Sequence, residues 1–118
     1  MDNILIRLRL DKILEHINEI QNDMEGITLD EFKKKSLLAR ATCFSIEQIG
    51  ENLNSVSKTL QEAYPEIDWE DIIGTRIVIA HHYHKIDYMK IYRIVLNDLP
   101  TLKKQINHII DDLTKKQP

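Results

Sequence analysis

Apolar residues recur at helical spacing over most of this chain. In the first segment they are separated alternately by four and three positions: Ile6, Leu10, Ile13, Ile17, Ile20 and Met24. This repeat places them on one face of a helix. It predicts a helix over roughly residues 2–24, which Asp2 or Asn3 caps at its start and Gly26 ends.

A second helical region begins where Thr28 and Glu31 have the spacing of a capping box. We expect it to run to about residue 60, with room for a break or kink near Lys35–Ser36, because the first apolar residues do not extend the later register. That register is formed by Ile46, Ile49, Leu53, Val56 and Leu60.

The clearest interruption of the helical pattern is the Tyr64–Ile67 segment, which contains a proline. Asp68 then has the position of a cap for a third element, which should continue to about His81 or His82. Trp69, just after the cap, supplies an apolar contact, and we expect it in the core.

The last segment keeps three- and four-residue spacing as far as Leu113, and Asp87 can cap its start. Pro100 lies inside this register. Proline removes one helical hydrogen bond and clashes with the carbonyl four residues earlier, so we expect a kink or restart at Asn97–Asp98.

These elements predict an all-α fold, an up-and-down bundle of four or five helices in one domain over residues 1–118. The composition agrees, because hydrophobic residues make up 42% of the 118 residues and only three glycines and three prolines are present. A helix face left over in so small a protein favours self-association, and a two-fold dimer is the usual outcome.

Charge and cysteine content exclude several classes of protein. The net charge of −3 argues weakly against a dedicated binder of duplex DNA. No stretch approaches the roughly 18 apolar residues of a membrane helix. Charged residues interrupt the apolar positions of the first segment, so we expect no signal peptide and a cytoplasmic location. A single cysteine, Cys43, excludes an intrachain disulfide and a cysteine-based zinc site.

The chemically distinctive stretch is 74–87. Within nine positions it holds an arginine, three histidines and a tyrosine: Arg76, His81, His82, Tyr83 and His84. Arginine binds phosphate bidentately, and histidine transfers protons near neutral pH. This combination suggests chemistry on a phosphodiester. The three histidines contain no i, i+4 pair, so we expect no metal site.

A straight helix does not direct both groups at one phosphate, because His81 lies about 140° around the helix from Arg76. The helix could end at His81, or the long Arg76 side chain could curl around it. Alternatively, Arg76 of one subunit meets His81 of another, which predicts a dimer. Glu51, one heptad beyond Phe44, could face Arg76 in a structural ion pair or in a supporting role.

The spacing Arg76-x4-His81-x-Tyr83 resembles the R-x4-H-x-Y motif of HepT-like proteins, a branch of the HEPN domains. Four further segments resemble this family in the same order: Ile46–Glu51, Ile67–Gly74, Ile86–Asp87 and Asn97–Pro100. The resemblance extends from about residue 4 to residue 113.

The resemblance implies a dimeric all-α bundle in which the two motifs face each other. It implies a metal- and cofactor-independent endoribonuclease, the toxin half of a toxin–antitoxin pair, with Arg76 and His81 catalytic and His82 a secondary candidate. The implied antitoxin is an MNT-type minimal nucleotidyltransferase, which can silence the toxin by transferring AMP to Tyr83.

One residue departs from the family pattern. The residue after the motif arginine is usually polar in the family, commonly asparagine, whereas here it is Ile77. The alternative function is therefore a catalytically weak or inactive helical module that binds a nucleotidyltransferase. A third interpretation is a plain dimeric bundle whose polar cluster is structural.

Overall fold

The structure is a computed structural model that describes residues 2–69 and 86–115. Every regular element in these ranges is helical, which confirms the all-α prediction. The elements are α1 (Asn3–Asp23), α2 (Leu29–Lys33), α3 (Ser36–Leu60), α5 (Tyr88–Arg93), the π-helical turn η1 (Ile94–Asp98) and α6 (Leu99–Lys115). The expected third helix lies outside the described residues, except for its first positions at Asp68 and Trp69.

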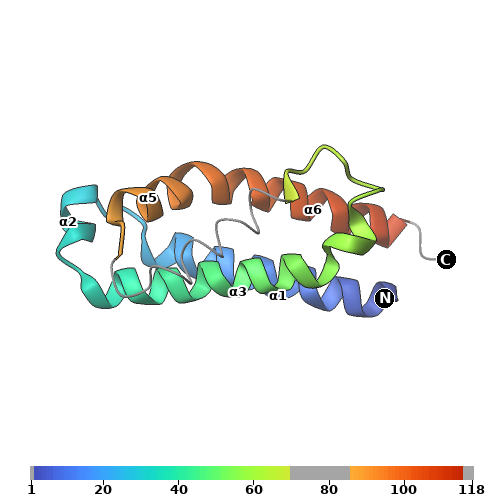
Figure 1. Cartoon of the computed structure of the whole chain (residues 1–118), viewed down its shortest axis with the longest axis horizontal. Coiled ribbons are helices and arrows are strands. Elements are labelled where there is room, and N and C mark those ends of the chain that lie inside the picture. The colour runs from blue at the N-terminus through green and yellow to red at the C-terminus, as the bar shows by residue number, and fades with distance from the viewer. Residues whose placement is uncertain (1, 70–85, 116–118) are drawn as a thin grey trace.

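The long helices lie side by side along the molecule. Helix α1 runs antiparallel to both α3 and α6, and α5, η1 and α6 follow one another along the opposite side from α3 (Figure 1). Short α2 closes one end, whereas the start of α1 and the end of α6 lie together at the other end. Helix α1 makes its largest contact with α3 and its second largest with α6.

The predicted apolar stripes form the core. From α1 the buried side chains are Ile6, Leu10, Ile13, Ile17 and Ile20, with Met24 directly after the helix. From α3 they include Ile46, Ile49, Leu53, Val56 and Leu60, and from α6 they include Leu99, Leu102, Ile106 and Ile109. Burial of these residues against one another is the main stabilising term of the bundle.

The predicted capping box is present at the start of α2. The Glu31 backbone N–H donates to Thr28 Oγ1 at 3.2 Å, and the Thr28 N–H donates to Glu31 Oε1 at 3.5 Å. Phe32 of this helix is fully buried and packs on the rings of Tyr88 and Tyr92, with ring centroids 5.6 and 5.9 Å apart. Although α2 is short, it is firmly attached to α5.

The helical pattern is interrupted at both expected places. Helix α2 ends at Lys33 and α3 begins at Ser36, as the break near Lys35–Ser36 predicts. The expected kink at Asn97–Asp98 takes the form of the π-helical turn η1, after which the Leu99 N–H donates to the carbonyl of Ile94, five residues earlier. The wider turn accommodates Pro100, which has no N–H to donate.

Replacing Thr28 by alanine should lower the free energy of unfolding by about 1 kcal/mol, because the Glu31 N–H loses its capping partner. Thr28→Ser keeps the hydroxyl and should remain close to the native stability. Urea unfolding monitored by circular dichroism measures both variants. Native stability in Thr28→Ala would show that the capping box does not hold α2.

Candidate functional site

Four of the five predicted site residues lie outside the described part of the chain: Arg76, His81, His82 and Tyr83. Ile77 lies outside it as well. The convergence of the arginine and the histidine therefore stays a prediction. The structure describes Glu51 and the segments that carry the motif on either side, which end at Trp69 and resume at Ile86.

Glu51 is exposed on α3, and it interacts with another group of the protein. The next residue, Asn52, is 7% exposed and joins α3 to α1. Its Nδ2 donates to the Gln48 carbonyl at 2.8 Å, and its Oδ1 accepts from Arg9 Nη1 at 3.3 Å. The buried amide of Asn52 thus holds the Arg9 guanidinium close to the turn of α3 that contains Glu51.

Before the motif, the chain is anchored by buried aromatic residues. Trp69 and Tyr64 are each 5% exposed, and the Trp69 Nε1–H donates to the Tyr64 carbonyl at 3.1 Å. Trp69 therefore lies in the core, as predicted. The last described residue before the motif is fixed by both burial and a hydrogen bond.

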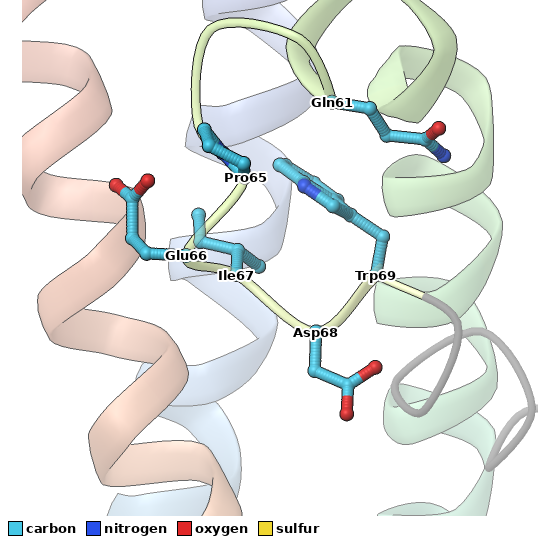
Figure 2. A pocket seen from close by; sticks show the side chains of 6 residues that line it. All are labelled: Gln61, Pro65, Glu66, Ile67, Asp68 and Trp69. Carbon is cyan, nitrogen blue, oxygen red and sulfur yellow. The ribbon is translucent and has the colours of Figure 1, made fainter.

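A shallow pocket of about 460 Å³ lies at this anchor (Figure 2). It is lined by Gln61, Pro65, Glu66, Ile67, Asp68 and Trp69. Of its apolar residues, Ile67 and Trp69 are almost completely buried, whereas Pro65 is exposed. The carboxylates of Glu66 and Asp68 give this lining negative charge, which disfavours phosphate.

After the motif, Asp87 caps α5 as predicted, and its Oδ1 accepts from the Lys90 N–H at 3.1 Å. Ile86 packs against the core, and Tyr88 contacts the ring of Phe32. The described chain therefore resumes next to α2. Both ends of the motif segment are held by packing that the structure describes.

The one thiol is not an activated nucleophile. Cys43 is half-buried on α3, and burial, together with the negative charge of Glu47, raises the pKa of the thiol. The reactive thiolate is therefore disfavoured at neutral pH. Among the described residues, no three His, Cys, Asp or Glu side chains gather as metal ligands would.

An exposed apolar pair on α3 was not recognised as a surface in the sequence. Leu37 is 75% exposed and Phe44 is 59% exposed, and they lie seven residues apart on one face of the helix. The sequence did contain a signal for this exposure, since Leu37 lies outside the register of the buried stripe.

No helix in the described ranges has the length and apolar character that crossing a membrane requires.

Comparison with known proteins identifies the family. The family model described as "Ribonuclease HepT-like" matches residues 13–109. A protein of Caldanaerobacter subterraneus subsp. tengcongensis named "Putative RNase" is 31% identical over 101 residues, which cover 86% of this chain and 90% of the relative.

Two further relatives also have names that describe them as ribonucleases. A Methanocaldococcus jannaschii protein named "Putative RNase" is 33% identical over 108 residues, covering 92% of this chain and 89% of the relative. The "Probable ribonuclease HepT" of Thermococcus cleftensis is 27% identical over 94 residues, covering 80% and 86%. No solved structure matches the chain. With this helical bundle and a family match that spans the Arg76–Tyr83 motif, the chain belongs to the HepT-like ribonuclease family.

Proposed function

We propose that this protein is an endoribonuclease that cleaves RNA without a metal ion, with Arg76 and His81 as its catalytic pair. The observation that carries the proposal is the match to the HepT-like ribonuclease family over residues 13–109, which include the whole motif. Relatives named as ribonucleases support the same activity.

The residue types suit this reaction. RNA carries its own nucleophile, the 2′-hydroxyl, which loses its proton to a base as its oxygen attacks phosphorus. The bond from phosphorus to the 5′-oxygen breaks, and that oxygen takes up a proton. His81 suits the proton transfers, and Arg76 stabilises the negative charge that develops on the phosphorane. His82 and Glu51 are the secondary candidates beside this pair.

The purified protein should cleave RNA in the presence of EDTA, and His81→Ala should reduce the rate by about 10²–10⁴-fold because proton transfer is lost. His84→Ala removes a nearby histidine outside the motif and should leave the rate unchanged. Gel assays with a labelled RNA measure all three proteins. Undiminished cleavage by His81→Ala would remove His81 from the mechanism.

A second candidate function is favoured by Ile77, which stands where the family usually has a polar residue. In this case the chain is a catalytically weak or inactive module that binds a nucleotidyltransferase. Intact RNA after incubation with native protein that still binds its partner would favour this candidate over the nuclease.

The active form that we propose is a two-fold dimer in which a second copy covers the exposed face of α3. Leu37 and Phe44 give this face its apolar character, and Arg40 and Glu47 lie on either side of Phe44. In two antiparallel α3 helices that cross at Phe44, Arg40 of each copy approaches Glu47 of the other. This charge complementarity favours a second copy over an unrelated apolar partner.

Phe44→Glu should convert the dimer to a monomer and abolish cleavage, because it places two carboxylates at the two-fold axis. The matched control is Leu96→Glu, since Leu96 of η1 is 56% exposed but lies on another element. Sedimentation equilibrium gives the mass of each variant. A Phe44→Glu protein that remains dimeric would rule out this face as the interface.

We also propose a nucleotidyltransferase partner of the MNT type, with this chain as the toxin of the pair. The support is the tyrosine of the R-x4-H-x-Y pattern. Its phenolic oxygen would attack the α-phosphorus of ATP, releasing pyrophosphate and the phenol proton. The bulky adenylate anion would then block the RNA site by steric exclusion and charge repulsion.

Protein co-expressed with such a nucleotidyltransferase should carry AMP on Tyr83 and lose its RNA cleavage. Tyr83→Phe should take up no adenylate, whereas Tyr88→Phe should be modified like the native chain. Intact-mass and peptide mass spectrometry locate the adduct. Adenylate on Tyr83→Phe would show that the acceptor is another residue.

A further inference from the structure

A single residue, Tyr64, organises the loop that leads into the motif. The Tyr64 backbone N–H donates to the Leu60 carbonyl at 2.9 Å. Its carbonyl accepts from the Ile67 N–H at 3.3 Å and from the Trp69 indole at 3.1 Å. Tyr64 therefore connects the end of α3 with the last described residue before the motif, which lies folded under the loop (Figure 2).

The hydroxyl of the same residue ties this loop to α6. Tyr64 Oη donates to Asp112 Oδ2 at 3.1 Å, and His108 Nε2 lies 3.6 Å from that same oxygen. The His108 ring meets the Tyr64 ring edge-on, with centroids 6.1 Å apart. Burial, the hydrogen bond to Asp112 and the negative charges of Asp112 and Glu66 raise the pKa of Tyr64, so its hydroxyl stays a donor at neutral pH.

We propose that Tyr64 and Asp112 are positioning residues of the ribonuclease, which fix Trp69, the last described residue before the motif. The inference rests on the proposed function. Arg76 follows Trp69 by seven residues and His81 follows it by twelve. Misplacing a reacting group by about 1 Å can cost as much as 10²-fold in rate.

Removing only the Tyr64 hydroxyl tests this role. Tyr64→Phe keeps the ring and all the backbone hydrogen bonds, and it should lower kcat by about tenfold with little change in KM, since no group that binds RNA is lost. Asp112→Leu should behave in the same way. Asp112→Asn keeps an oxygen that can accept from Tyr64 and should retain most of the native kcat.

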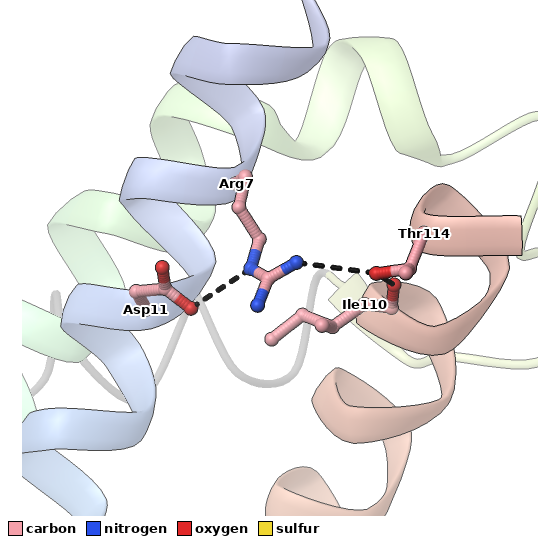
Figure 3. Close-up of polar contacts among 4 residues, drawn as sticks. All are labelled: Arg7, Asp11, Ile110 and Thr114. Carbon is pink, nitrogen blue, oxygen red and sulfur yellow. Dashed lines mark hydrogen bonds and ion pairs between the residues drawn. The ribbon is translucent and has the colours of Figure 1, made fainter. Parts of the chain in front are cut away.

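The matched control is a second side-chain hydrogen bond of α6, which joins this helix to α1 instead of to the loop. Arg7 Nη1 donates to Thr114 Oγ1 at 3.2 Å, and the Thr114 hydroxyl donates to the Ile110 carbonyl at 2.9 Å (Figure 3). Arg7 Nε also pairs with Asp11 Oδ1 at 3.1 Å. Thr114→Val should lower the melting temperature about as much as Tyr64→Phe but leave kcat unchanged. Equal losses of kcat in these two variants would overturn the inference.

A readout independent of RNA separates this inference from the proposed function. Trp69 is the only tryptophan, so fluorescence reports on the loop. Tyr64→Phe and Asp112→Leu should shift the emission to longer wavelength and increase quenching by acrylamide, whereas Thr114→Val and Asp112→Asn should do neither. Native emission in Tyr64→Phe overturns the positioning role. If these two variants show the shifts but the native protein cleaves no RNA, only the proposed function fails.

Discussion

The structure depends on the burial of one face of α1 between α3 and α6. Its isoleucine and leucine side chains are almost completely excluded from water. Within the described ranges, α1 contacts both of the other long helices extensively, whereas α3 and α6 make little direct contact with each other. Helix α1 is therefore the shared partner through which the two sides of the bundle are held at a fixed separation.

Because α3 and α6 have little direct contact, side-chain interactions near the motif help to hold the two sides of the bundle together. The Tyr64–Asp112 hydrogen bond joins the loop after α3 to α6. At the other side of the motif, Asp87 caps α5 and the aromatic contacts of Phe32 hold that helix against α2. The segment that we propose to carry the catalytic groups is thus bounded on both sides by packed and hydrogen-bonded residues, and such anchoring favours holding reacting groups in place.

Local rules let the sequence predict much of this fold. The spacing of Ile6 to Met24 predicted the buried face of α1, and Thr28 and Asp87 were recognisable as caps because capping involves residues three positions apart. Pro100 predicted a kink but not its π-helical form. A missing N–H does not specify which hydrogen bonds the neighbouring backbone groups form instead. The Tyr64–Asp112 bond joins positions 48 residues apart, and no local pattern encodes it. The motif was recognisable from residue types and spacing, but its geometry remains a prediction.

We propose that each catalytic site forms between two copies of the chain, with Arg76 from one copy and His81 from the other. Arg76→Ala and His81→Ala subunits carrying different tags should be co-expressed and their mixed dimer purified. That dimer retains one site with both groups intact, so it should recover about half of the native cleavage rate, although each variant alone is inactive. A mixed dimer as inactive as its parents would contradict the claim, because both groups would then belong to one chain.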